Sequence, residues 1–257
     1  MGRGFGVAAA VNHDVIREVA REAEQLGYTS FWCNDTPGGD GIAGLAAAAA
    51  VTERIKLGVG VIPLDRRPAD VIARDLAALN VPQERLLLGV GSGGDRRVSK
   101  VREGIERLHE LIPAPVIVGA LGPRMTSLAG AVGDGVLFNW QTPGTAQSSG
   151  QICRDAAESA GRPRPLVMAY VRTALLPQAD ERLDVEAGRY SRVPAYAAHF
   201  ARMGVSARDT AVSGPDASTL QPQIAAHEVS LDETVIRAIT ADDTAASILE
   251  LLRACAP

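Results

Sequence analysis

The sequence predicts an α/β protein that folds as a single (β/α)8 TIM barrel over residues 1–257. Short apolar runs alternate with helical patterns along the whole chain, and eight such runs are found, which is the number of strands that closes this barrel. Hydrophobic residues make up 46% of the chain but aromatic residues only 4%, and small side chains suit close packing of helices on a sheet. An open, doubly wound parallel sheet is the main alternative, because it shows the same alternation.

The individual elements follow from apolar periodicity and from helix start and stop signals. Asn12 is placed to cap the first helix, which Gly27 ends. Residues 204–231 hold scattered polar residues and prolines, so we expect them to be loop-like or loosely helical. Further helices are expected at residues 42–52, 68–79, 98–111, from 123 onward, about 145–160, 182–203 and 244–255, and strands at 5–10, 30–34, 55–62, 86–90, 116–118, 136–139, 166–176 and 234–239.

Charge and cysteine content exclude several classes of partner. The net charge is −4 with both signs interspersed, so no basic face for nucleic acid is expected. Cys33, Cys153 and Cys255 are few and widely spaced, which fits a reducing compartment without a disulfide framework. The longest small apolar run, residues 45–51, is too short to cross a membrane. We therefore expect a cytoplasmic protein with a small-molecule substrate, compatible with a homodimer, and without a nucleic-acid or membrane partner.

The most informative segment is residues 115–140, PVIVGALGPRMTSLAGAVGDGVLFNW. An apolar strand leads into a turn of small residues, and a helix opens directly after it. Small residues allow close approach of a ligand to the backbone, and a helix N-terminus offers unpaired N–H groups to an anion. An ordinary strand-to-helix turn would look the same locally. The predicted phosphate cradle consists of Gly119, Ala120, Leu121, Gly122, Pro123 and Arg124.

Polar residues at the end of the second predicted strand are candidates for chemistry. Asn34, Asp35 and Thr36 follow an apolar run, and in a parallel barrel such strand ends face the active site. Helix capping or a turn before Pro37 is the competing interpretation. The charged residues 65–67 after the third strand could hold a substrate or cofactor tail, although a solvated cluster is the default.

Glycines in the third and fourth strands indicate places where a ligand meets the backbone. Gly58 and Gly60 lie inside the third strand, where interior glycine often marks a bulge. Residues 89–94 match G-x-G-x-x-G after a strand, but they sit in the fourth unit and no acid ends the next strand, so a dinucleotide site is disfavoured. The four histidines show no metal-ligand spacing, and we expect no metal site.

Five segments in order resemble the luciferase-like flavin and deazaflavin oxidoreductases: residues 27–35, 52–63, 68–80, 85–93 and 115–140. The resemblance implies a luciferase-like barrel with a bulge and a cis peptide at or near Gly60 and Val61, behind the cofactor ring. It also implies the deazaflavin F420 as cofactor, with FMN as the alternative. The residues that it assigns to cofactor binding are Gly60, Val61, Gly91, Ser92, Gly93, the six of the cradle, Asn139 and Trp140, and those assigned to substrate or proton transfer are Asn34, Asp35 and Thr36.

Two departures bear on the activity that the resemblance implies. Relatives that oxidise alcohols or sugars with F420 carry a histidine where this chain has Thr36, and a glutamate where it has Gly94. A family segment between the fourth helix and fifth strand, after Leu111, is also missing. The leading hypothesis is hydride transfer from reduced F420, or FMN-dependent monooxygenation, on a small organic substrate. A flavin-binding protein without turnover is the alternative, and a Rossmann-type dehydrogenase or methyltransferase a distant one.

Overall fold

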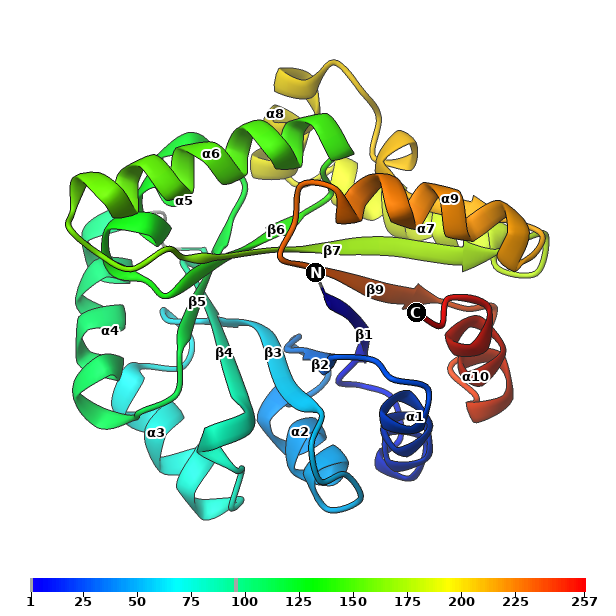
Figure 1. The fold of residues 1–257 in the computed structure, drawn as a ribbon, viewed down its shortest axis with the longest axis horizontal. Helices are drawn as coiled ribbons and strands as arrows, with labels where there is room; N and C mark the ends of the chain where they lie inside the picture. Colours follow the sequence, from blue (N-terminus) through cyan, green and yellow to red (C-terminus); the bar gives the residue numbers. More distant parts are fainter. Residues whose placement is uncertain (1, 95–96) are drawn as a thin grey trace.

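The chain forms a closed parallel barrel, as the computed structural model of residues 2–94 and 97–257 shows (Figure 1). Pairing of β6 with β7 and of β9 with β1 closes the ring, so the open doubly wound alternative is wrong, and the Rossmann-type reading fails with it. The sheet runs in the order β6-β5-β4-β3-β2-β1-β9-β7-β8. Its strands are β1 (Gly2–Ala8), β2 (Ser30–Asn34), β3 (Lys56–Pro63), β4 (Leu86–Gly91), β5 (Val116–Ala120), β6 (Gly135–Asn139), β7 (Leu166–Leu175), β8 (Val212–Gly214) and β9 (Glu233–Ile239).

Helices surround this ring and bury their apolar faces against it (Figure 1). Asn12 caps the first of them, as predicted, by accepting a hydrogen bond from the Asp14 amide. Gly27 has a φ of 87°, the left-handed conformation that glycine tolerates where a helix ends. The helices are α1 (His13–Gln25), α2 (Gly41–Ala49), α3 (Ala69–Ala78), α4 (Val98–Leu111), α5 (Pro123–Val132), α6 (Pro143–Ser159), α7 (Asp180–Ser191), α8 (Pro194–Met203), α9 (Ala217–Glu228) and α10 (Ala245–Ala254).

The structure differs from the sequence prediction after β7. The helix expected over residues 182–203 is two helices, because Pro194 lacks an amide donor and keeps Val193 extended at ψ 121°. Residues 204–231, expected to be loop-like or loosely helical, contain β8 and α9. Asp216 caps α9, and β8 pairs with the end of β7 beyond the point where β6 stops. Three residues are too few for a strand pattern to be visible in the sequence.

The interior of the barrel contains an aromatic pair packed in an apolar layer. Trp32 and Tyr170 meet edge to face with ring centroids 5.7 Å apart. They pack with Leu87, Ile117, Leu137, Met168 and Val235 into a cluster separate from the outer core. A Cβ on Gly58 would overlap the Trp32 indole, and one on Gly60 would overlap Tyr170. The two glycines of β3 therefore make room for the two rings.

We expect Gly58→Ala to lower the free energy of unfolding by about 1–3 kcal/mol, because the new methyl group overpacks against Trp32. Urea denaturation measures this change. Gly144→Ala is the control, since its Cβ would meet nothing within 4 Å and alanine favours the helix by up to about 1 kcal/mol. An unchanged midpoint for Gly58→Ala would contradict the close fit.

Candidate active site

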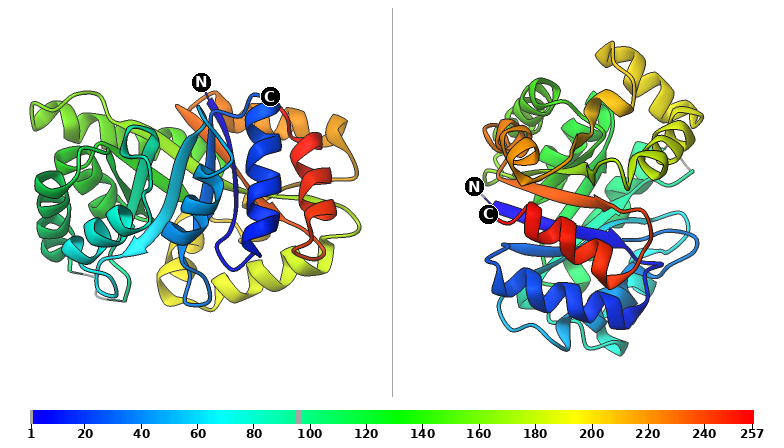
Figure 2. Two further views of the ribbon diagram at one scale, coloured as in Figure 1. Left: turned by 90° about the horizontal axis from the view of Figure 1, so that it is seen from below. Right: turned by 90° about the vertical axis from the view of Figure 1, so that its right-hand side faces the viewer.

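A cavity of about 780 Å³ opens where the barrel strands end. Residues of seven strands line it together with residues of α7 and α8, and Figure 2 shows these two helices lying together at one end of the barrel. Fifteen of the sixteen site residues expected from the sequence lie in its lining. They are Asn34, Asp35, Thr36, Gly60, Val61, Gly91, Ser92, Gly93, Gly119, Ala120, Leu121, Gly122, Pro123, Arg124 and Asn139.

One wall of the cavity is built by glycines around Val61. The Gly60–Val61 peptide is cis, at the place that the resemblance implies, and the β3–β4 register shifts between Val59 and Ile62. A Cβ on Gly91 would lie 2.9 Å from one methyl group of Val61, and a Cβ on Gly119 would lie 2.9 Å from the other. Only glycine fits at these two positions while Val61 keeps its place. The result is a shallow surface of backbone and one valine.

The end of β4 continues into a tight glycine turn. Gly93 has a φ of 64°, and a Cβ there would overlap the carboxylate of Asp65. The Gly94 amide donates to that carboxylate at 2.7 Å. Asp65 therefore holds this turn in place. The glycines of the G-x-G-x-x-G segment form the end of a barrel strand and the turn that follows it.

The predicted cradle is divided between a strand and a helix. Gly119 and Ala120 belong to β5 rather than to the turn, so the turn proper is Leu121 and Gly122, and α5 begins at Pro123 as expected. Arg124 is exposed in the first turn of α5. Arg202 of α8 donates to the Leu121 carbonyl at 2.9 Å, which brings a second guanidinium beside the turn. Arg202 could not be predicted from sequence patterns, because it lies 81 residues after Leu121 along the chain.

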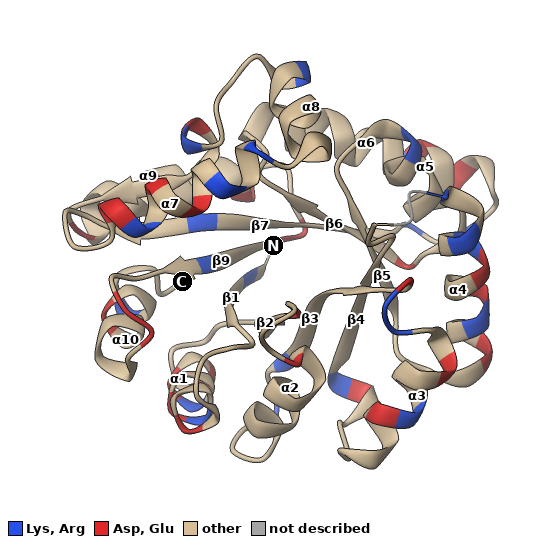
Figure 3. Cartoon of the chain, turned by 180° about the vertical axis from the view of Figure 1, so that it is seen from behind, with Lys and Arg blue, Asp and Glu red and all other residues tan. Residues whose placement is uncertain are grey.

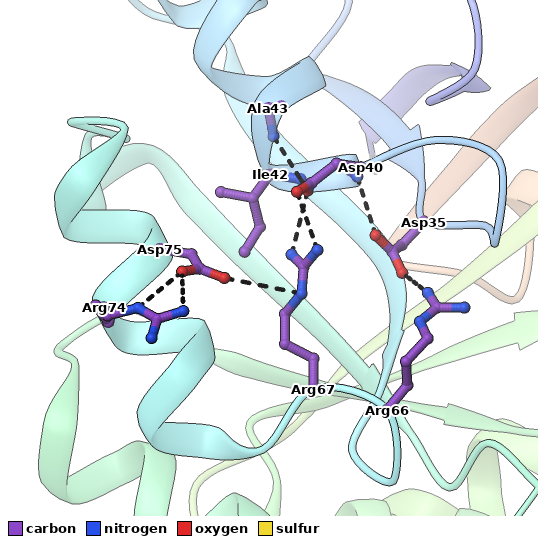
Figure 4. Close-up of polar contacts among 9 residues, drawn as sticks. Asp35, Asp40, Ile42, Ala43, Arg66, Arg67, Arg74 and Asp75 are labelled. Atoms are coloured by element: carbon purple, nitrogen blue, oxygen red, sulfur yellow. Dashed lines mark hydrogen bonds and ion pairs between the residues drawn. The ribbon is translucent and has the colours of Figure 1, made fainter.

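Asp35, expected to be catalytic, is held by protein groups (Figure 4). Its side chain is buried, accepts a hydrogen bond from the Gly41 amide at 3.0 Å and forms an ion pair with Arg66. Arg67 pairs similarly with Asp40, whose carboxylate caps α2. Arg66 and Arg67 therefore link the loop after β3 to the end of β2 and to the start of α2, which supports the capping interpretation of this strand end.

Trp140 is the expected site residue that the cavity lining does not include. Its φ of 55° turns the chain after β6, and its indole is buried with Phe200 and Ala187 behind the wall of the cavity. His199 hydrogen-bonds the Trp140 carbonyl at 2.9 Å, and burial lowers the pKa of this imidazole. Trp140 therefore supports the wall and does not face the cavity.

A buried polar group formed by β7, β9 and α7 was not predicted from the sequence. Arg172 of β7 donates from Nε to Glu186 at 3.1 Å and also to the Asn139 side chain, whose Nδ2 donates to Tyr196 at 2.9 Å. Arg237 of β9 lies opposite Arg172 in the strand register. In the sequence, β7 and β9 have the pattern of apolar runs. Only the alternation of side chains along β7 indicates that Arg172 lies on the same face of the strand as Tyr170.

Glu186 is ionised inside this group. Burial opposes its charge, but the guanidinium groups of Arg172 and Arg237 outweigh that penalty and hold the pKa of Glu186 below its ordinary value of 4.5. Because the folded state binds the proton more weakly than the unfolded state, this contribution to stability is complete above pH 4.5 and is lost as pH falls through the lowered pKa.

We expect Glu186→Gln to lower the free energy of unfolding at pH 7 by about 2 kcal/mol, because Arg172 loses its buried acid. The difference from the wild type should shrink as the pH is lowered below 4.5. Urea denaturation at pH 7, 5 and 4 measures it. Glu250→Gln removes an exposed carboxylate of α10 and should show no such convergence. A difference that stays constant with pH would contradict the ionised pair.

Neither a metal cluster nor a membrane-spanning helix is found in the part of the chain that the structure describes. Among residues 2–94 and 97–257, no group of three or more histidine, cysteine, aspartate or glutamate side chains is arranged to hold a metal ion. Within the same residues, no helix is long and apolar enough to span a bilayer.

Comparison with known proteins gives consistent matches along the chain. The luciferase-like monooxygenase family model matches residues 3–111 and 96–254. A 5,10-methylenetetrahydromethanopterin reductase of Methanolobus tindarius is 26% identical over 62% of this chain and 60% of its own. An F420-dependent glucose-6-phosphate dehydrogenase of Beutenbergia cavernae is 32% identical over 45% of this chain and 49% of its own. The aligned part thus spans about half to three fifths of these relatives.

A solved structure shares the fold over the full chain. The oxygenating constituent of 3,6-diketocamphane monooxygenase from Pseudomonas putida, in complex with FMN, superposes with a TM-score of 0.69. The superposition covers 100% of this chain and 97% of that one, at 14% identity. With the family model matching nearly all of the sequence, the chain belongs to the luciferase-like monooxygenase family.

Proposed function

We propose that this protein is an oxidoreductase that uses reduced F420 to transfer a hydride to a small organic substrate. The observation that carries the proposal is a single cavity that is lined both by the cis Gly60–Val61 peptide and by the N-terminus of α5. The 32% identity to an F420-dependent dehydrogenase supports the choice of F420. FMN, which the P. putida structure contains, is the alternative cofactor.

The residues present fit such a cofactor on two counts. The surface formed by Val61, Gly91 and Gly119 accepts a flat ring, and a Cβ at either glycine would collide with Val61. The exposed first turn of α5 offers free amide groups, with Arg124 and Arg202 beside it, for a phosphate. When bound, the cofactor would supply the hydride.

The other residues of the cavity would bind and orient the substrate. Asn34 has a buried Oδ1 without a hydrogen-bond partner in the described part of the chain, so we propose that Asn34, with Thr36, contacts the substrate. Asp35 would act as a positioning residue through Gly41 and Arg66. The Tyr170 hydroxyl is likewise buried without a partner among those residues, and burial raises its pKa, so it stays protonated and can donate.

Reduction of the substrate is the favoured direction, because the described cavity residues offer donors rather than a free base. Oxidation of an alcohol requires a group that takes up the hydroxyl proton. The carboxylates of Asp35 and Glu186 are both paired with arginine. An electron-poor carbonyl or conjugated alkene would instead accept a hydride and then a proton.

We expect F420 to bind the protein. Arg124→Ala and Arg202→Ala should each weaken this binding by about tenfold or more, because each substitution removes a positive charge that lies beside the phosphate. Isothermal titration calorimetry with F420, and in parallel with FMN, measures this. Arg102→Ala is the control, because Arg102 is exposed on α4 and pairs with Glu106.

The outcomes separate the hypotheses. Binding of neither cofactor would refute the proposal, and tighter binding of FMN than of F420 would replace F420 by FMN. Unchanged affinity in both arginine variants would show that the phosphate lies elsewhere. Cofactor binding without oxidation of the reduced cofactor by any enone or ketone tested would favour a binding protein without turnover.

A further inference from the structure

Two arginines lie side by side inside the barrel mouth, and the proposed cofactor site does not use them. Arg172 and Arg237 occupy paired positions on β7 and β9, and both line the cavity. They are only 2% and 9% exposed. Arginine is almost never buried to this degree unless an anion compensates its charge. In Figure 3 each of these two strands carries a basic band, whereas β2, β4, β5 and β6 contain no charged residue.

The protein compensates only one of the two charges. Glu186 pairs with Arg172, whose second hydrogen bond goes to the neutral side chain of Asn139. The other carboxylate in the described lining, Asp35, directly follows β2 and pairs with Arg66. Arg237 donates from Nη1 to the Ala238 carbonyl, and its buried Nε has no partner in the described structure. Two guanidinium groups and one carboxylate leave a charge of +1.

We propose that Arg172 and Arg237 together bind a carboxylate of the substrate, so that the protein acts on a small organic acid. This inference rests on the proposed function, because it assigns the substrate class of the same cavity. A monoanion neutralises the remaining charge, and the planar guanidinium matches a planar carboxylate. The unpartnered Nε of Arg237 is a donor available to it.

The position of the pair relative to the glycine wall separates substrate from cofactor. In the ring of strands, β7 and β9 lie across the barrel from β3 and β4, which carry Val61 and Gly91. Tyr170 connects the two sides, since it is a β7 residue whose ring end contacts Gly60. A carboxylate held at the arginines would place the rest of a small acid over Tyr170 and towards that wall. The α5 turn has Arg124 and Arg202 for a phosphate.

Binding of simple anions tests the inference without a known substrate. We expect benzoate to bind the full-length protein, with and without saturating cofactor, more tightly than benzamide or phenyl phosphate. Arg237→Met should weaken benzoate binding by about tenfold or more, the loss expected when a charged hydrogen bond to a carboxylate is removed. Arg189→Met is the matched control, because Arg189 lines the same cavity from α7 but is exposed. Calorimetry gives the dissociation constants, and urea denaturation verifies that both variants fold.

Each result has one meaning. Equal binding of benzoate and benzamide, or an unchanged benzoate affinity in Arg237→Met, would overturn the carboxylate site. Tighter binding of phenyl phosphate than of benzoate would overturn the choice of a carboxylate. A loss of cofactor affinity in Arg237→Met, with benzoate displaced by the cofactor, would assign the arginines to the cofactor and also overturn the inference. Failure of wild-type protein to bind F420 or FMN, with benzoate still bound, would refute the proposed function but not the acid site.

Discussion

The fit of two aromatic rings against two glycines is the contact on which the rest of the site depends. Trp32 and Tyr170 fill the barrel axis only because Gly58 and Gly60 have no side chains. Aliphatic side chains pack around the rings, the Trp32 indole donates to Ser30 at 2.6 Å, and Tyr170 lines the open cavity. Because the rings block the axis, the cavity has a floor and opens at the end where the parallel strands terminate. The strand β3, which carries both glycines, thus stabilises the core and also shapes the cavity.

The helices α7 and α8, which cover the cavity, are held by a buried charged group in addition to the apolar cluster around Trp140. Arg172 reaches Glu186 of α7 and Asn139 of β6, and Asn139 in turn reaches Tyr196 of α8. The guanidinium also lies 4.3 Å from the centre of the Trp140 ring. Removing one member of such a buried network leaves the others without partners, which costs more than the bond itself. The same residues therefore form the polar wall of the cavity and hold α7 and α8 against the barrel.

The barrel, the glycine wall and the start of α5 could be predicted from the sequence, because these features depend on local signals. Apolar runs, glycines within strands and a proline after a turn are readable one segment at a time. Arg172 and Arg237 could not be found in this way, since their proximity depends on the register of strands that lie 65 residues apart. For Asp35 the sequence left two interpretations open, catalysis and capping. A carboxylate at a strand end has the same sequence signal whether it binds a substrate or accepts from the Gly41 amide.

The cavity therefore has two chemically different walls, and this difference restricts the reaction. One wall, around Val61, Gly91 and Gly119, has no charge and suits a flat ring, whereas the opposite wall carries Arg172 and Arg237. An acid held at the arginines would present its apolar part to the ring, with the protonated hydroxyl of Tyr170 between the two walls. Thr36 and Gly94, which stand where the resemblance implies a histidine and a glutamate, supply no base. In the described part of the chain the arrangement thus provides an anion anchor and a hydrogen-bond donor, which suit reduction of an unsaturated or carbonyl-containing acid better than oxidation of an alcohol.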